Sequence, residues 1–400
     1  MEKADVVIVG AGPSGSSAAY FLASRGVDVV LIDKSNFPRD KTCGDGLGPR
    51  SIQMLDKMGL SDWLGSNGYH RCDRIRLFAN DSTYFEARIP AEDTPSPYFY
   101  VTSRADLDTK LVETVAEAGA RVLTGRKVTG LINPGGIVKG VKVGDGDEEI
   151  RCRVVISADG THGTFIKQTG IRYIEPHALA IRAYYANVKG LDDCINIYLD
   201  KRIPTGYAWV FPISKGDANI GVGLTSRKIK ELNLDIKGLL TWFLTEKDTY
   251  PVDLRSATAI TDTKGAYLRM GYGRHDVVAD GIILVGDAAA LINPLSGEGI
   301  AYALESGELA ADAVKAALDK GDVSSQSLAS YRDALNKHFL VDHRICEFLR
   351  WVAYKPKWMD RAIRTGQEHP DFAARLVSVL MSTAKPSSIF HPKLLRHYLV

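Results

Sequence analysis

The first part of the chain alternates between short apolar runs and segments of helical composition. Residues 5–10 (DVVIVG) are a β-branched apolar run that ends in glycines, and residues 16–26 then read as a helix that closes at Gly26. Residues 27–34 (VDVVLIDK) predict a second buried strand, which ends at Asp33. Apolar strands that alternate with helices are typical of a parallel sheet covered on both faces, so the pattern predicts an α/β fold.

The pattern changes in the middle of the chain. Residues 104–120 have helical spacing, and residues 121–143 alternate like antiparallel strands. Between about 177 and 270 the apolar stretches are short and alternating, which predicts a mostly antiparallel sheet. Residues 281–318 return to strand, glycine loop and long helix, and the last ~70 residues are helical in pattern and rich in aromatic residues.

A glycine-rich turn follows the first strand directly. Gly10-Ala11-Gly12-Pro13-Ser14-Gly15 fits G-x-G-x-x-G, in which Gly10 permits a tight turn, Gly12 lets a pyrophosphate approach, and Gly15 lets helix pack on strand. Asp33 lies at the end of the second strand, where its carboxylate can accept both ribose hydroxyls. The combination predicts dinucleotide binding, and the acid at this position argues against a 2′-phosphate.

Composition and charge exclude several classes. Apolar residues make up 45% and charged residues 24% of the 400 residues, which excludes a disordered or fibrous chain. The net charge of +2 excludes a general nucleic-acid binder, and no apolar run approaches the ~18 residues of a membrane span. The five cysteines are scattered, so we expect a reducing cytoplasm, no disulfide framework and no metal site.

Three further motifs identify the dinucleotide. Gly286-Asp287 closes an apolar strand, Asp159-Gly160 closes another, and Arg104 opens the predicted helix 104–120. Their order resembles that of flavoprotein hydroxylases and their relatives, in which the late aspartate binds a ribityl hydroxyl of FAD. An ordinary helix cap is the alternative for Asp287, because aspartate is a favoured N-cap residue.

Three blocks narrow the resemblance further. They are residues 37–50 (FPRDKTCGDGLGPR), residues 207–212 (YAWVFP) and residues 219–223 (NIGVG). Together they resemble the geranylgeranyl reductase family, whose members are FAD enzymes that saturate isoprenoid double bonds in archaeal lipids, chlorophyll side chains or menaquinone tails. The resemblance runs from residue 4 to about 310, and the sequences of the motifs are most similar to those of bacterial menaquinone reductases. Arg269 departs from the pattern, since relatives often carry proline there.

The resemblance implies a p-hydroxybenzoate-hydroxylase-like fold. We expect a Rossmann-type FAD-binding domain at 1–170 and 271–330, an inserted, mostly antiparallel β-sheet substrate domain at 171–270, and a helical C-terminal region at 331–400. The residues expected to contact FAD are Gly10, Gly12, Gly15, Asp33, Lys34, Cys43, Gly44, Gly46, Arg104, Val128, Asp287, Gly299 and Ile300.

Two groups of residues are expected to act on the substrate. Reduced FAD offers a hydride from its N5, and Cys43, Tyr207 or a water would deliver the accompanying proton. Tyr207, Trp209 and Phe211 alternate on one strand and so share a face, which would line an apolar pocket for a prenyl chain. The alternatives are a small buried filler for Cys43 and ordinary sheet core for the three aromatic residues.

Partners and competing functions complete the predictions. The electron donor is NADPH, ferredoxin or a deazaflavin, and the substrate is a prenylated lipid or quinone. Residues 351–400 carry a net charge of +5 with Trp351, Tyr354 and Trp358 among the bases, which is typical either of peripheral contact with the cytoplasmic face of a membrane or of a solvated helix face. The alternative functions are a flavin-dependent monooxygenase or halogenase on the same fold, and a non-catalytic flavin-binding redox protein.

Overall fold

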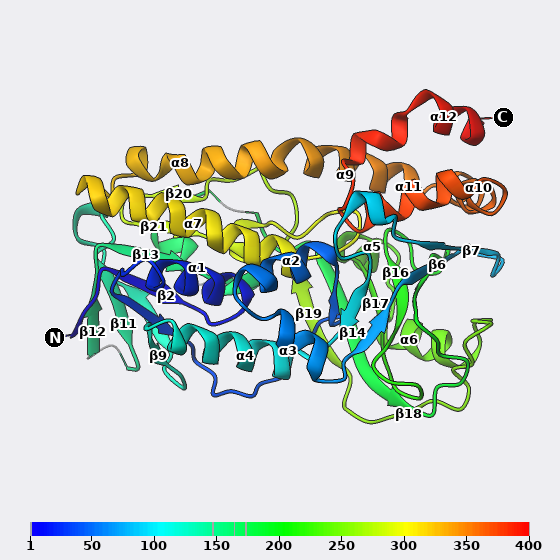
Figure 1. The fold of residues 1–400 in the computed structure, drawn as a ribbon, viewed down its shortest axis with the longest axis horizontal. Helices are drawn as coiled ribbons and strands as arrows, with labels where there is room; N and C mark the ends of the chain where they lie inside the picture. Colours follow the sequence, from blue (N-terminus) through cyan, green and yellow to red (C-terminus); the bar gives the residue numbers. More distant parts are fainter. Residues whose placement is uncertain (1, 146–147, 164, 173, 400) are drawn as a thin grey trace. The chain divides into compact units, whose positions relative to one another are not determined.

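The computed structural model describes residues 2–145, 148–163, 165–172 and 174–399. By its internal contacts the chain divides into two compact units, each assembled from three separate stretches (Figure 1). Unit 1 comprises Met1–Lys41, Arg104–Pro176 and Arg269–Arg344. Unit 2 comprises Thr42–Ser103, His177–Leu268 and Ile345–Val400.

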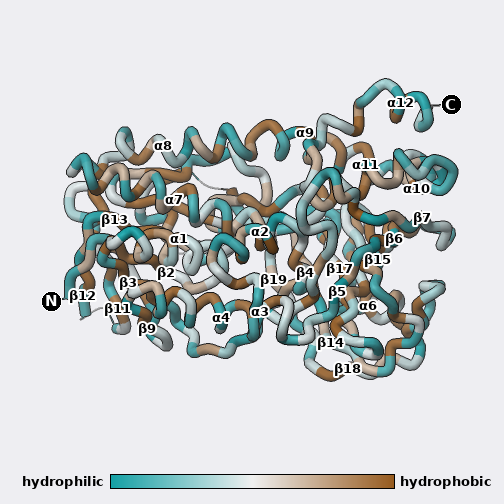
Figure 2. Tube along the Cα trace, viewed as in Figure 1, coloured by the Kyte–Doolittle hydropathy of each residue, from teal (hydrophilic) through white to brown (hydrophobic). Residues whose placement is uncertain are grey.

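Unit 1 is built on a six-stranded sheet. Its strand order is β20-β21-β13-β2-β3-β9, and all neighbours pair in parallel except β20 with β21. Each residue of the central strands β2, β3 and β13 is buried. All of these residues are apolar except Ser157 at the end of β13, as expected for a parallel sheet that is covered on both faces (Figure 2). The strands are β2 (Val6–Val9), β3 (Val29–Ile32), β9 (Arg121–Leu123), β13 (Val154–Ser157), β20 (Val278–Ala279) and β21 (Ile282–Leu284).

Helices α1 and α7 pack closely in this unit. A side chain at Gly307 of α7 would place its Cβ 2.5 Å from the carbonyl oxygen of Ser14 and 2.7 Å from the Cβ of Ser17, so glycine is needed for this approach. The helical elements of unit 1 are α1 (Pro13–Ala23), α4 (Arg104–Glu117), η3 (Gly160–His162), η4 (Ile166–Gln168), η5 (Gly286–Ala289), α7 (Ile300–Lys320), α8 (Ser325–Leu335) and the π-helical η6 (Asn336–Leu340). Helix α9 (Val341–Ala353) continues from η6 across the boundary between the units.

A second sheet of unit 1 corrects one sequence prediction. Its order is β1 (Glu2–Lys3), β12 (Glu148–Arg151), β11 (Gly140–Val143) and β10 (Val128–Leu131), around the short η2 (Pro134–Gly136). The sequence predicted residues 121–132 and 136–143 as an antiparallel pair, whereas β9 pairs in parallel with β3 and only β10 pairs with β11. The break falls at Gly125, whose φ of +67° turns the chain between the two strands.

Unit 2 contains a predominantly antiparallel sheet of eight strands. The order is β18-β14-β17-β16-β15-β6-β7, with β19 also paired to β14. The antiparallel sheet predicted over 177–270 is confirmed, but β6 and β7 come from residues 74–88, within the stretch 1–170 that the sequence predicts as part of the FAD-binding domain. The strands are β6 (Arg74–Phe78), β7 (Tyr84–Arg88), β14 (Ala178–Ala186), β15 (Cys194–Tyr198), β16 (Tyr207–Pro212), β17 (Ala218–Thr225), β18 (Thr258–Ala259) and β19 (Lys264–Leu268).

Smaller elements complete unit 2. They are a three-stranded sheet of β4 (Gly46–Leu47), β8 (Phe99–Val101) and β5 (His70–Cys72), and the helices α2 (Pro49–Lys57), α3 (Ser61–Ser66), η1 (Ala91–Asp93), α5 (Ser226–Glu231), α6 (Ile236–Thr245), α10 (Pro356–Glu368), α11 (Pro370–Leu380), η7 (Pro386–Phe390) and α12 (Pro392–Leu399). The helical C-terminal pattern is therefore confirmed, whereas the helices α5 and α6 inside the predicted sheet region were missed.

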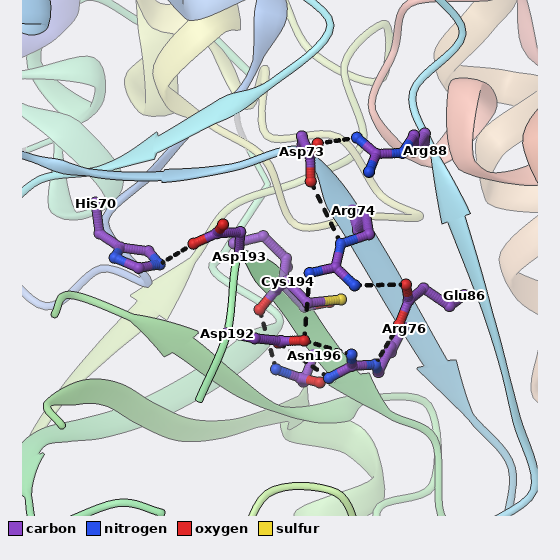
Figure 3. A network of polar contacts seen from close by, with 11 residues as sticks. His70, Asp73, Arg74, Arg76, Glu86, Arg88, Asp192, Asp193, Cys194 and Asn196 are labelled. Atoms are coloured by element: carbon purple, nitrogen blue, oxygen red, sulfur yellow. Dashed lines mark hydrogen bonds and ion pairs between the residues drawn. The ribbon is translucent and has the colours of Figure 1, made fainter. Parts of the chain in front are cut away.

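A charged network holds β6 in the sheet (Figure 3). The guanidinium of Arg76 donates to Glu86 of β7 at 2.6 Å and to Asp192, just before β15, at 2.6 and 3.0 Å. Arg74 also reaches both carboxylates, at 2.8 and 3.3 Å. Because Arg76 is only 5% exposed, removing both carboxylates would leave a buried charge without compensation, which is strongly destabilising.

The C-terminal helices cover β7. Gln367 of α10 donates to the carbonyl oxygen of Tyr84 at 2.7 Å, and a Cβ on Gly366 would lie 2.5 Å from the ring of Phe85. None of the helices in the described part of the chain is both long and apolar enough to cross a bilayer.

Candidate functional site

The glycine-rich turn joins β2 to α1, as predicted. Gly10 has a φ of +106°, and a Cβ there would lie 2.3 Å from the carbonyl oxygen of Ala158. A Cβ on Gly15 would lie 1.8 Å from the carbonyl oxygen of Gly10. Both positions therefore accept only glycine, and they bring the start of α1 close to the end of β2.

Positive charge gathers around the N-terminus of α1. Gly12 is its N-cap and brings no capping side chain, so the first N–H groups of the helix can face an anion. A Cβ on Gly12 would be 3.8 Å from Arg39 Nη2 and 3.9 Å from Arg104 Nη2. Arg104 donates twice to Asp108, at 2.9 and 2.7 Å, and Arg39 lies 3.0 Å from the same carboxylate. Arg39 and Arg104 thus share a single carboxylate, and part of their positive charge is left to bind an anion. A diphosphate, which carries two negative charges, fits this arrangement.

Asp33 lies at the end of β3 beside this turn. Its carboxylate accepts hydrogen bonds from the backbone N–H groups of Ala11 and Ser35, both at 2.8 Å. These bonds fix the carboxylate next to the glycine turn, and each oxygen keeps a lone pair for a hydroxyl donor. The neighbouring Lys34 is exposed, and Val128 is the first residue of β10.

The motifs Asp159-Gly160 and Gly286-Asp287 lie close together within unit 1. Thr161 of η3, next to Asp159-Gly160, donates to the carboxylate of Asp287 at 3.3 Å. Asp287 lies inside η5, and the N-cap of α7 is Gly299, so Asp287 does not cap that long helix. A Cβ on Gly299 would lie 3.6 Å from Asp287 Oδ1, so the start of α7 at Ile300 adjoins the carboxylate.

Lys41 lies beside Asp287 and near the two arginines at the N-terminus of α1, Arg39 and Arg104. Its ammonium lies 3.9 Å from the carboxylate of Asp287. Desolvation and the nearby Arg104 guanidinium lower the pKa of Lys41, which means that its surroundings resist a further positive charge. Arg39 and Lys41 belong to the family block at residues 37–50, but nothing in the local sequence indicates that they turn toward Gly12 and Asp287.

Arg269 occupies the position that departs from the family pattern. It is 2% exposed, and its Nη1 donates to the carbonyl oxygen of Ala288 at 3.3 Å. The guanidinium thus packs directly behind η5, next to Asp287.

In unit 2, the loop Cys43–Gly46 lies on one face of the large sheet. A Cβ on Gly44 would be 3.0 Å from the ring of Phe211 and 3.6 Å from Trp209 Nε1. The loop can therefore approach these aromatic residues so closely only because residue 44 is glycine. Cys43 is half-buried and Asp45 is 1% exposed, with a φ of +65°.

A buried polar network fixes this loop. The side-chain amide of Asn219 donates to the carbonyl oxygen of Cys43 and to the carboxylate of Asp45, both at 2.8 Å. Tyr184 donates its hydroxyl to the same carboxylate, and Arg182 donates to the Cys43 carbonyl at 3.3 Å. Arg182 and Tyr184 were not predicted from the sequence, and Asn219 was part of a family block without an assigned role, although buried polar residues within otherwise apolar strands are an available signal.

The three aromatic residues of β16 share a face, as their spacing predicts. Tyr207 and Trp209 have ring centroids 6.0 Å apart, and Trp209 and Phe211 6.3 Å. Trp209 is 6% exposed, its indole N–H donates to Asn219 Oδ1 at 2.9 Å, and its ring packs on Gly221. Its environment is that of sheet core, whereas Tyr207 and Phe211 are half-buried on the same face.

Comparison with known proteins agrees with this geometry. Residues 3–220 match the family described as FAD binding domain. The chain is 34% identical over 363 residues to a menaquinone reductase of Mycobacterium tuberculosis, covering 89% of this chain and 86% of that protein. It is 32% identical over 348 residues to digeranylgeranylglycerophospholipid reductase 1 of Methanopyrus kandleri, covering 84% and 86%.

A solved structure gives the same result for the fold. A geranylgeranyl bacteriochlorophyll reductase-like protein from Thermoplasma acidophilum aligns with a TM-score of 0.82 at 25% identity, over 95% of this chain and all of that one. The fold and its glycine turn thus define an FAD-dependent oxidoreductase. The chain belongs to the geranylgeranyl reductase family of these flavoproteins.

Proposed function

We propose that this protein saturates carbon–carbon double bonds in a prenyl chain, either a menaquinone tail or a geranylgeranyl lipid. The observation that carries the proposal is the 34% identity, over nearly the whole chain, to a protein named menaquinone reductase. The glycine loop at Cys43, held against the half-buried aromatic face of β16, supports it, because an apolar substrate needs an apolar wall.

The residues of unit 1 would hold FAD, which supplies a hydride when bound and reduced. Gly10, Gly12 and Gly15 would admit the pyrophosphate at the N-terminus of α1, and Arg39 and Arg104 would neutralise it. Asp33 would accept the ribose hydroxyls and Asp287 a ribityl hydroxyl. The remaining contacts proposed for the cofactor are those of Lys34, Cys43, Gly44, Gly46, Val128, Gly299 and Ile300.

The residues of unit 2 would manage the proton and exclude water. Either the Cys43 thiol or the Tyr207 hydroxyl would hold the proton that an alkene carbon receives. Phe211 and Tyr207 would present an apolar wall that keeps water from the reacting carbons. Asn219 would act as a positioning residue, since it holds the Cys43 backbone through the carbonyl oxygen.

Partners follow from the proposed substrate. The electron donor would be NADPH, ferredoxin or a deazaflavin. A prenylated quinone or lipid resides in the membrane, so we propose that the protein acts in the cytoplasm with peripheral contact at the cytoplasmic face.

The test is a reaction without oxygen. The purified holoenzyme is reduced chemically under anaerobic conditions and mixed with menaquinone or a geranylgeranyl lipid in detergent, and the products are measured by mass spectrometry. We expect the gain of one H₂ per reduced bond. A product that forms only with oxygen, and that carries a hydroxyl group or a halogen, would contradict the proposal.

A further inference from the structure

Residues 345–399 present aromatic side chains to solvent. Among the residues that the structure describes, every exposed Phe and Trp side chain lies here: Phe348 (51% exposed), Trp351 (62%), Trp358 (49%) and Phe390 (39%). Single exposed apolar residues are ordinary on a protein surface, but a group of large rings on one segment marks an interaction site.

Three of these rings touch one another. Phe348 and Trp351, one turn apart on α9, stack with centroids 6.1 Å apart, and Phe390 of η7 lies 6.2 Å from Phe348. We call these three residues the aromatic patch. Because the rings come from two different elements, the patch is a surface formed by the fold, and much of each ring still faces water.

One lysine contacts the aromatic patch, and two more exposed lysines lie in the same C-terminal segment. The ammonium of Lys355 lies 5.0 Å from the ring centroid of Trp351, and Lys357 and Lys385 are exposed. Residues 345–399 carry nine Lys and Arg against four Asp and Glu, a net charge of +5, while the rest of the chain has a net charge of −3. Figure 2 shows α10 as a mainly hydrophilic helix. Aromatic rings beside lysines are the combination that lies at the headgroup level of a membrane.

We infer that the aromatic patch and its lysines dock this protein on the surface of a bilayer that contains anionic lipids. Phe348, Trp351 and Phe390 enter the headgroup region, and Lys355, Lys357 and Lys385 are attracted to the lipid charge. The net charge of +5 favours an anionic lipid surface over a second copy of the same segment, which it would repel. The inference depends on the proposed function in one respect only: a prenyl substrate would reside in the membrane, which gives the protein a reason to bind there.

The test uses vesicles of phosphatidylcholine, alone or mixed with phosphatidylglycerol, and sedimentation of the holoenzyme with them. We expect binding to the mixed vesicles that weakens as salt is added. The double variant F348S/W351S should bind at least about tenfold more weakly, and K355E/K357E/K385E should lose the preference for phosphatidylglycerol. Leu232→Ser, at an exposed apolar side chain elsewhere in unit 2, and K201E/K215E/K230E, at exposed lysines, are the matched controls and should bind like the wild type.

The other results of these experiments each contradict or support the docking surface or the proposed function. Equal binding of F348S/W351S and the wild type would overturn the inference. So would a wild type that ignores vesicles but forms a dimer that F348S/W351S abolishes, because the patch would then join two copies. If the protein binds vesicles but reduces no prenyl substrate in detergent, the proposed function fails and the docking surface stands. If the patch variants lose vesicle binding but keep turnover in detergent, both proposals are supported.

Discussion

Asn219 and Asp45 are joined by a hydrogen bond of 2.8 Å between residues 174 positions apart in the sequence. Asn219 also donates to the carbonyl oxygen of Cys43 and accepts from the indole of Trp209. One buried amide thus connects the glycine loop to the aromatic strand β16, and every hydrogen-bonding atom of its amide group has a partner.

Asn219→Ala should release the loop. The substitution leaves the Trp209 indole N–H buried without its acceptor, at a cost of about 1–3 kcal/mol in the free energy of unfolding. We expect turnover per folded molecule to fall at least about tenfold, because Cys43 is no longer held. Chemical denaturation and single-turnover alkene reduction measure the two effects.

Asn196→Ala is the matched control. Asn196 is fully buried on the neighbouring strand β15, and strand alternation directs it to the opposite face from Trp209. This variant should lose stability but keep its turnover per folded molecule. Equal turnover in both variants would show that Asn219 has only a structural role.

Cys43→Ser tests the proton donor. Serine keeps nearly the same volume, but a thiol with a pKa of about 8.5 donates a proton far more readily than a hydroxyl group. We expect alkene reduction to slow at least tenfold, about 1.4 kcal/mol in the barrier, while reduction of the flavin by its donor is little affected. Turnover within about twofold in both Cys43→Ser and Cys43→Ala would point to Tyr207 or water as the source.

Asp287→Ala tests the cofactor contact. Loss of a charge-assisted hydrogen bond costs about 1.5–3 kcal/mol, so FAD should bind roughly 10- to 150-fold more weakly. Titration of the apoprotein with FAD, followed by flavin fluorescence, measures this. Asp319→Ala removes an exposed carboxylate on α7 that pairs with Lys315 and should leave FAD affinity unchanged.

The free energy of unfolding should depend on pH through His275. Burial and the charge of Arg269 lower the pKa of His275 from 6.5 to about 4, with Asp276 opposing the shift. Between these values the unfolded chain binds a proton that the folded chain does not, so stability is full above pH 6.5 and falls as the pH drops toward 4. The loss is on the order of 3 kcal/mol at most. His275→Gln should flatten denaturation midpoints over this range, and an unchanged profile would contradict the assignment.

The sequence predicted the parts of the site that depend on local geometry. Gly10, Gly12 and Gly15 are recognisable because the turn between β2 and α1 permits no side chain at two of these positions. Asp33 is recognisable because it ends a buried strand. In each case the residues that determine the structure are adjacent in the chain.

The residues that were missed depend on long-range contacts. Asn219 faces Cys43 only because β16 and β17 pair in one register, and Arg39 faces Gly12 only after the chain has turned beyond β3. Strand β6 was not assigned to the large sheet, because its parallel pairing with β15 joins Arg74 to Cys194 across more than a hundred residues. Strand β7 was missed with it, because it joins the sheet only through its antiparallel pairing with β6. Periodicity carries no information about such partners.

The division into two units has a consequence for anyone who wishes to cut the protein into fragments. The chain crosses between the units five times, at residues 41–42, 103–104, 176–177, 268–269 and 344–345. Because the three stretches of each unit alternate along the chain with those of the other, neither unit can be produced from a single uninterrupted gene segment. We expect limited proteolysis to give nicked molecules whose pieces stay together, and an isolated unit would need its three stretches to be joined by new linkers.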